Sequence, residues 1–219
     1  MVATPALVLG IDPGLTRCGV GAVRGPAHRP RLVAARCVRT PVELPLEQRL
    51  ARLRSELDAI VREVQPDGVA VERVLFSGNA RTAMATGQAA GVALLVAAEH
   101  GLAVTSYSPN EVKATVAGDG RAEKDAVGRL VAAQLGLDAP PRPADVADAL
   151  AVAITHLAQA RGPVAGTAAT PARARLEAAA ATARRDARGG WEAVVAARRA
   201  DGSGTGAGAG PTSRRGDAA

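Results

Sequence analysis

Four acidic residues stand at places in the chain where a carboxylate is costly. Asp12 ends one apolar run, and Glu72 lies inside another. Asp145 and Asp148 are three residues apart in an otherwise apolar segment, so on a helix they share one face. A buried carboxylate costs free energy unless it is paired or binds a metal ion. These positions make the four acids candidates for a functional site.

Each acid, taken alone, also has a structural explanation. Asp12 precedes Pro13-Gly14, and Asp-Pro-Gly is most often a plain turn. Glu72 could be a buried acid with a partner, Asp145 a helix-capping residue, and Asp148 a solvated side chain. Taken together, the four are harder to explain this way, because like charges that lie close repel each other unless a cation joins them.

The donor set indicates which cation this would be. All four candidate ligands are carboxylates, which suit magnesium or manganese. Two such ions about 4 Å apart stabilise the attacking and leaving oxygens of a phosphoryl displacement. The acids therefore predict metal-assisted hydrolysis of a phosphodiester. His156 lies about two turns beyond Asp148 on the same predicted helix, and we expect a structural or surface role for it.

The elements that must position these acids alternate along the chain. Strands are predicted over Leu7–Ile11, Arg17–Val23, Arg31–Arg39, Gly68–Leu75 and Ala103–Tyr107. Helices are predicted over about 45–64, Asn79–His100, Ala122–Leu135 and Ala144–Ala160, with one more starting at the cap residue Ser108. A meander followed by alternating helices and strands is typical of an α/β domain with a mixed sheet and helices on both faces.

The domain organisation follows from composition. The chain has 219 residues, of which 47% are hydrophobic, enough for one sizeable domain. From Gly162 onward the composition changes to mostly Ala, Arg, Gly, Thr and Pro. We therefore predict a folded domain over 1–161 and a disordered tail over 162–219.

Charge and cysteine content narrow the function class. The formal net charge of +6 permits nucleic-acid binding without proving it. Cys18 and Cys37 form neither a disulfide scaffold nor a zinc-ligand pattern. No signal peptide is apparent, and the longest uncharged stretch, Thr82–Ala98, is too short and too interrupted to span a membrane. We expect a soluble cytoplasmic protein.

Small residues recur on one predicted helix. Ala83, Gly87 and Gly91 follow one another at intervals of four, so they line one face. Such a face allows close helix approach, either in the core of the domain or between two copies of the chain. The sequence leaves both possibilities open.

Four motifs resemble the RuvC family of Holliday-junction resolvases. They occur in the family's order and with suitable spacing, and they cover Gly10–Gly19, Val71–Val74, Gly87–Val92 and Ala144–Ala151. The resemblance extends over about residues 7–160. It implies a ribonuclease-H-like fold with a mixed five-stranded sheet, a homodimer, and two magnesium ions per subunit that manganese can replace.

The resemblance also implies an activity. The family nicks two opposing strands of a four-way DNA junction symmetrically, in recombination and DNA repair, and leaves 5′-phosphate ends. It works with the RuvA–RuvB branch-migration complex. By motif position, the family's catalytic and metal-ligand places fall on Asp12, Glu72, Asp145 and Asp148.

The resemblance gives a meaning to the only two lysines among the 27 basic residues, Lys113 and Lys124. Both lie in segments similar to the family's DNA-contacting segments, although chance retention on solvated helices is the alternative. The chain departs from the family at Leu75, where an aromatic residue that stacks on DNA bases is usual. Phe76 takes that role if the loop shifts by one residue; otherwise the stacking contact is weakened.

Three other functions share some of these features. A sugar-kinase or actin-like ATPase needs a second phosphate loop in a duplicated domain, and no such repeat appears in the chain. A non-catalytic junction-binding protein would not need all four acids. A related nuclease that acts on RNA is distinguished only by its substrate.

Overall fold

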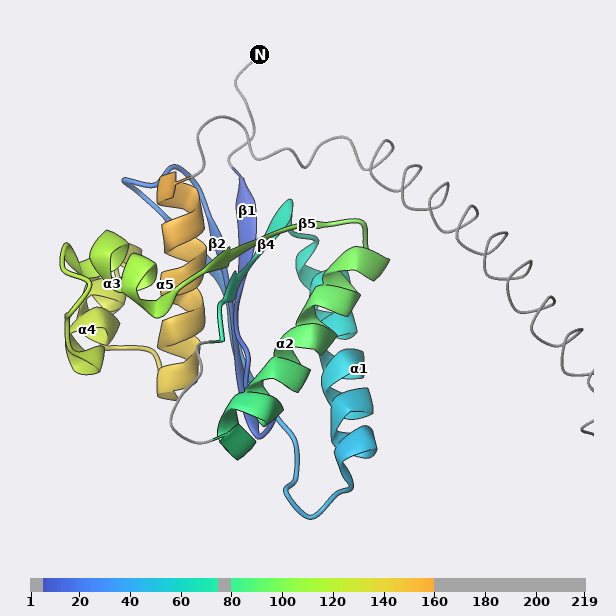
Figure 1. Ribbon diagram of the computed structural model, residues 1–219. Coiled ribbons are helices and arrows are strands. Elements are labelled where there is room, and N and C mark those ends of the chain that lie inside the picture. The colour runs from blue at the N-terminus through green and yellow to red at the C-terminus, as the bar shows by residue number, and fades with distance from the viewer. Residues whose placement is uncertain (1–5, 75–79, 160–219) are drawn as a thin grey trace, which may run out of the picture. The chain divides into compact units, whose positions relative to one another are not determined.

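The structure is a computed structural model, and it describes residues 6–74 and 80–159. A five-stranded sheet with the strand order β3-β2-β1-β4-β5 forms its centre (Figure 1). The strands are β1 (Leu7–Asp12), β2 (Arg17–Arg24), β3 (Arg31–Arg39), β4 (Gly68–Glu72) and β5 (Ala103–Tyr107). The first three pair antiparallel, and β4 and β5 run parallel to β1. The predicted mixed sheet is thereby confirmed.

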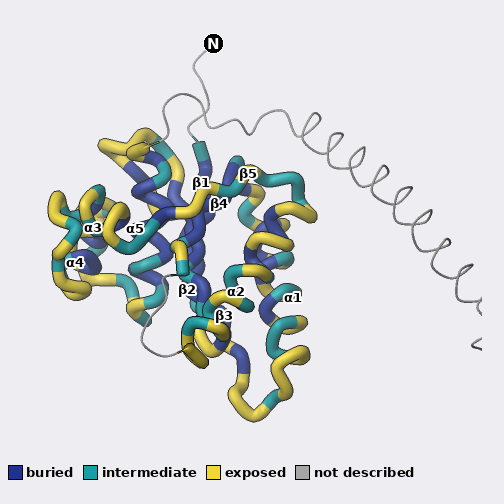
Figure 2. Tube along the Cα trace, viewed as in Figure 1, coloured by how far each residue is buried: buried dark blue, intermediate teal, exposed yellow. Residues whose placement is uncertain are grey.

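Helices cover both faces of this sheet. One face carries α1 (Leu46–Val64) and α2 (Ala80–Glu99). The other carries α3 (Pro109–Ala117), α4 (Lys124–Leu135) and α5 (Ala144–Gln159), so the sheet is the middle layer of three (Figure 1). In Figure 2 the central strands of the sheet are largely buried, as is much of α5.

Burial on both faces explains why β1 is apolar throughout. Side chains alternate between the two faces of a strand. Leu9 belongs to the core under α1 and α2, whereas its neighbour Val8 belongs to the core under α5. A strand covered on both sides has no solvent-facing position, so it shows a continuous apolar run instead of alternation.

The approach of α5 to the sheet depends on glycines. A Cβ atom on Gly10 would overlap the backbone carbonyl oxygen of Ala149, and one on Gly19 would overlap that of Asp145. Since glycine has no Cβ, the backbone of α5 can lie directly on β1 and β2. The first turn of α5 is thereby fixed beside the end of β1.

Two predicted boundaries were wrong by two residues or more. Strand β4 ends at Glu72 and not at Leu75, because its neighbour β5 ends at Tyr107 and offers only one more carbonyl, which accepts from the Arg73 amide at 2.7 Å. Helix α4 begins at Lys124 and not at Ala122. The preceding residues form a turn in which a carboxylate oxygen of Asp119 accepts from the Arg121 amide at 2.9 Å.

The predicted cap of α3 is confirmed. The Ser108 hydroxyl accepts from the Glu111 amide at 3.3 Å, and the Glu111 carboxylate accepts from the Ser108 amide at 2.7 Å. This reciprocal pair satisfies two backbone donors that a helix start leaves free. It fixes α3 directly after β5.

Some predictions concern residues that the structure does not describe. Leu75 and Phe76 fall in the gap at 75–79, and the predicted tail over 162–219 lies beyond residue 159. The domain boundary near 161 therefore stays a prediction. Across the described ranges, no helix combines the length and the apolar character needed to cross a membrane.

Candidate active site

Two of the predicted acids meet at one edge of the sheet. Asp12 is the last residue of β1, and Glu72 is the last residue of β4. The two strands are parallel neighbours, with Ile11 opposite Val71, so the next residue on each strand carries its carboxylate to the same edge. Strand order and register alone make Asp12 and Glu72 neighbours.

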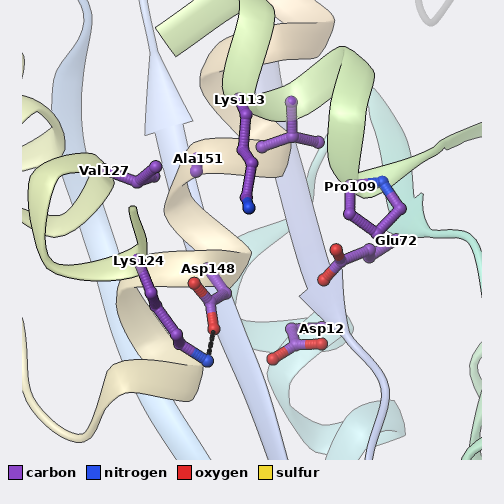
Figure 3. Close-up of a pocket in the computed structure, with 9 residues that line it drawn as sticks. Asp12, Glu72, Pro109, Lys113, Lys124, Val127, Asp148 and Ala151 are labelled. Atoms are coloured by element: carbon purple, nitrogen blue, oxygen red, sulfur yellow. Dashed lines mark ion pairs between the residues drawn. The ribbon is translucent and has the colours of Figure 1, made fainter. Parts of the chain in front are cut away.

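Helix α5 supplies a third acid to this place. Asp148 lines a cavity of about 230 Å³ together with Asp12 and Glu72. Figure 3 shows the three carboxylates around this cavity, each from a different element. The remaining lining residues come from α3, α4 and α5, and they are Pro109, Val112, Lys113, Lys124, Val127 and Ala151.

Burial and repulsion both act on the acids at the sheet edge. Burial is the largest cause that raises the pKa of Asp12, to about 8, and the charges of Glu72 and Asp148, a hydrogen bond with Glu72 and the charge of Asp145 raise it further. The pKa of Glu72 is also raised, by burial first. The hydrogen bond with Glu72 raises the pKa of Asp12 but lowers that of Glu72, as expected when the two carboxyl groups share one proton.

Both acids of α5 are held by basic side chains. Nζ of Lys124 lies 2.6 Å from Oδ2 of Asp148, and Nε of Arg17 lies 3.2 Å from Oδ2 of Asp145. Asp145 does not line the cavity, although its charge is one of those that act on Asp12. It lies inside the first turn of α5, so the alternative role of a capping residue is not borne out.

The cluster has the chemistry of a divalent cation site. Within the described ranges, no group of three or more His, Cys, Asp or Glu side chains already encloses a point where a metal ion could bind. Arg17 and Lys124 hold the two α5 carboxylates instead. The donors are nonetheless all oxygens. The neighbouring carboxylate charges contribute to raising the pKa of Asp12 and of Glu72, and a bound cation would remove this repulsion. The residues therefore fit a magnesium or manganese site.

The two predicted DNA-contacting lysines lie beside the acids. Lys113 of α3 and Lys124 of α4 both line the cavity, and Figure 3 shows Lys113 extending into it. His156 does not line it. Nδ1 of His156 instead lies 2.9 Å from the hydroxyl of Tyr107, which agrees with the structural role expected for this histidine.

Two residues of the site were not predicted from the sequence. They are Arg17, which pairs with Asp145, and Gly19, which lets α5 lie close to β2. A signal was present, because Gly19 and Gly21 alternate along β2 and therefore mark one strand face without side chains. Arg17 carried no comparable signal, since its pairing with Asp145 depends on two elements far apart in the chain.

Comparison with known proteins gives one consistent result. Residues 8–156 match the family model described as "Crossover junction endodeoxyribonuclease RuvC". A protein of that name from Salinispora arenicola is 53% identical over 179 residues, covering 81% of this chain and 97% of the relative. One from Thermobifida fusca is 51% identical over 151 residues, covering 68% of this chain and 83% of the relative.

Solved structures agree with this. A structure of T. thermophilus RuvC in complex with Holliday junction substrate is similar, with a TM-score of 0.66 and 38% identity over 69% of this chain and 92% of that chain. The yeast mitochondrial Holliday junction resolvase has a TM-score of 0.51 at 13% identity, over 78% of this chain and 84% of that chain. At that identity the likeness shows the fold alone.

Proposed function

The chain belongs to the RuvC family of crossover junction endodeoxyribonucleases, and from this premise we propose that it resolves four-way (Holliday) DNA junctions by paired nicks in opposing strands. The family match covers nearly all of the described residues. The observation that carries the proposal is the cavity at the sheet edge, where Asp12, Glu72 and Asp148 lie together with two lysines. The biological setting is homologous recombination and DNA repair.

The proposed ligands of two Mg²⁺ ions per subunit, which Mn²⁺ could replace, are Asp12, Glu72, Asp145 and Asp148. Bound there, divalent ions would activate water and offset the charge that develops on the phosphate. The protein's part is to hold the carboxylates in place: the sheet register fixes Asp12 and Glu72, and the close packing of α5 fixes the other two. Arg17 and Lys124 must release their carboxylates for this.

The proposed reaction is a hydrolysis at phosphorus. The water oxygen forms a bond to phosphorus, the bond from phosphorus to the 3′-oxygen breaks, and that oxygen takes up a proton. One strand end then carries a 5′-phosphate and the other a 3′-hydroxyl. Lys113, whose ammonium extends into the cavity, is placed to contact a phosphate oxygen of the bound strand.

DNA contacts are proposed for Lys113, Lys124 and Phe76. The lysines are supported by their place in the cavity. Phe76 lies four residues beyond Glu72, in the gap of the described residues, and its role as a base-stacking platform rests on the family resemblance and on residue type.

A homodimer is proposed through the exposed face of α2. Gly87 and Gly91 are exposed, and a Cβ on either would meet no heavy atom of the described residues within 4 Å, so packing inside the subunit does not explain them. The same helix exposes Met84 by 66% and Leu95 by 53%. A twofold dimer presents two identical sites. A four-way junction that is cut on two opposing strands requires two such sites.

Cooperation with the RuvA–RuvB branch-migration complex is proposed on the family resemblance alone. The relatives from Salinispora arenicola and Thermobifida fusca are bacterial proteins. Chromosomal DNA lies in the bacterial cytoplasm, and we propose the same location for this protein.

The test is a substrate comparison. The full chain is incubated with a four-way junction, a linear duplex and an RNA–DNA hybrid, each with Mg²⁺ or with EDTA. We expect paired nicks at symmetric positions in the junction, with Mg²⁺ only. A junction that is bound but stays intact with Mg²⁺ would contradict the nuclease proposal, and preferential cleavage of the hybrid would favour the RNA-directed alternative.

A further inference from the structure

A second hollow, rich in arginine, lies beside the cavity lined by Asp12, Glu72 and Asp148, which we call the acid cavity. Its volume is about 390 Å³, and its lining residues are Thr16, Arg17, Arg39, Thr40, Pro41 and Arg52. They come from the loop between β1 and β2, the start of β2, the end of β3, the segment that leads into α1, and α1 itself. No acidic residue is among those that line it, so the hollow presents three guanidinium groups to solvent.

The arrangement of these arginines destabilises the folded chain unless a bound group offsets their charge. Arg17 and Arg39 are direct partners across the antiparallel pair of β2 and β3. Like charges directly opposite on neighbouring strands destabilise a sheet. In the described part of the chain, Arg39 and Arg52 have no carboxylate partner that would relieve this repulsion. An anion bound in the hollow would relieve it.

Hydrogen bonds with neighbouring groups orient the two hydroxyl groups of the hollow. The buried Thr40 hydroxyl donates to the Leu15 carbonyl oxygen at 2.5 Å and accepts from Nε of Arg49 at 2.9 Å. Nη2 of Arg49 donates to the Thr16 hydroxyl at 2.8 Å. The oxygen of Thr16 thus already accepts, which leaves its hydrogen to donate into the hollow. The hollow therefore offers donors, and the oxygen of each hydroxyl already accepts one hydrogen bond from Arg49.

Arg17 connects the hollow to the acid cluster. Its side chain lines the hollow, while its Nε lies 3.2 Å from the Asp145 carboxylate. The loop between β1 and β2 that follows Asp12 contributes Thr16 to the same hollow. An anion held there would therefore sit next to the place where we propose that a phosphodiester is cut.

We propose that this hollow binds a backbone phosphate of the junction DNA, adjacent to the phosphate that is hydrolysed. The inference rests on the proposed function. Guanidinium groups match the oxygens of a phosphate through parallel hydrogen bonds, and the Thr16 hydroxyl adds another donor. A contact of this kind fixes the register of the strand and carries no base sequence information.

The test is the salt dependence of junction binding in EDTA, where no cleavage is expected. Arg39→Gln and Arg52→Gln each remove one charge from the hollow. Arg62→Gln is the matched control, since Arg62 is on α1 like Arg52 but pairs with Asp58 and is 70% exposed. Fluorescence anisotropy with a labelled junction gives the slope of log K against log salt concentration.

Loss of a phosphate contact lowers this slope by about 1. We expect that loss in Arg39→Gln and in Arg52→Gln, with the wild-type slope kept in Arg62→Gln. Wild-type slopes in both hollow variants would overturn the proposal, even if their affinities fall. Arg39→Lys and Arg52→Lys keep the charge, so they serve if a glutamine variant fails to fold. They should keep the slope but bind more weakly, because an ammonium cannot replace a bidentate guanidinium; wild-type affinity in both would also overturn the proposal.

The two proposals fail in different ways. If the wild-type chain cleaves the junction while both hollow variants keep its slope, only the phosphate site is wrong. If the wild-type chain binds the junction but leaves it intact with Mg²⁺, the proposed nuclease function is wrong, whatever the slopes show.

Discussion

Nζ of Lys124 lies 2.6 Å from Oδ2 of Asp148, so a cation of the protein already occupies a carboxylate that we assign to a metal ion. Partial burial lowers the pKa of Lys124, but the hydrogen bond and charge of Asp148 outweigh this and the net shift is upward. The ammonium is therefore charged at neutral pH, and it competes with a divalent cation for the same oxygen.

This competition makes a prediction about metal affinity. Lys124→Gln removes the competing charge and should tighten Mn²⁺ binding in the absence of DNA. Lys124 is 62% exposed, so the gain is limited to that of a solvent-screened pair, up to about 1 kcal/mol or about fivefold in Kd. Isothermal titration calorimetry measures it. Arg129→Gln, which removes an exposed charge of the same helix, is the control, and weaker Mn²⁺ binding in Lys124→Gln would contradict the argument.

The carboxylates at the sheet edge are expected to be needed for cleavage and not for junction binding. Asp12→Asn and Glu72→Gln keep the side-chain size but remove the charge that binds a metal ion. Even loss of a residue that merely supports a metal ligand costs about 10–100-fold, so we expect a loss of at least about 100-fold in cleavage rate. Asp138→Asn, in an exposed loop, is the control. Near-normal cleavage by either site variant would remove that residue from the proposed site.

The glycine at the contact between β2 and α5 should be sensitive to a single methyl group. In Gly19→Ala the new Cβ would overlap the backbone of Asp145, so either the strand or the helix must move. Overpacking of this kind costs about 1–3 kcal/mol, and movement of α5 should also lower the cleavage rate. Urea unfolding and the junction assay measure the two effects.

Gly128→Ala is the matched control for this experiment. Gly128 is also buried, but on α4, where a Cβ would lie 3.7 Å from Pro140 in ordinary contact. Alanine favours a helix over glycine by up to about 1 kcal/mol, so this variant should be as stable as the wild type or more so. Equal stability of Gly19→Ala and Gly128→Ala would show that α5 does not need the glycine surface.

His156 should make stability depend on pH. Burial lowers its pKa in the folded protein below the value of about 6.5 for an exposed histidine. The unfolded chain therefore takes up the proton first, so this stability is full above about pH 6.5 and is lost as the pH falls through that value toward the folded pKa. In His156→Gln the part of the loss in unfolding free energy that His156 causes at low pH should disappear. Urea unfolding at about pH 7.5 and 5.5 measures it, with exposed His28→Gln as the control.

The acids at the sheet edge could be predicted because their signal is local. Asp12 and Glu72 interrupt apolar runs, and such runs are recognisable as buried strands without knowledge of their neighbours. The cap at Ser108 is local as well, since it depends on residues within one turn of its own helix. The α/β class follows from the order of these elements.

What the sequence did not predict depends on tertiary contacts. The strand order makes β1 and β4 neighbours, although α1 and two strands lie between them in the chain. The pairs of Arg17 with Asp145 and of Lys124 with Asp148 exist only once α5 is packed on the sheet. The end of β4 is determined by where β5 stops, which no window around Glu72 contains.

The packing of α5 on β1 and β2 also has a consequence for protein synthesis. The first strand and the last helix of the described chain together build the acid cavity, so the site is incomplete until the ribosome has released nearly all of residues 6–159. Contacts between residues so far apart in the chain form late, and domains generally fold as units. A nascent chain that lacks α5 has Asp12 and Glu72 but neither Asp145 nor Asp148, and is expected to be unable to cut DNA during its own translation.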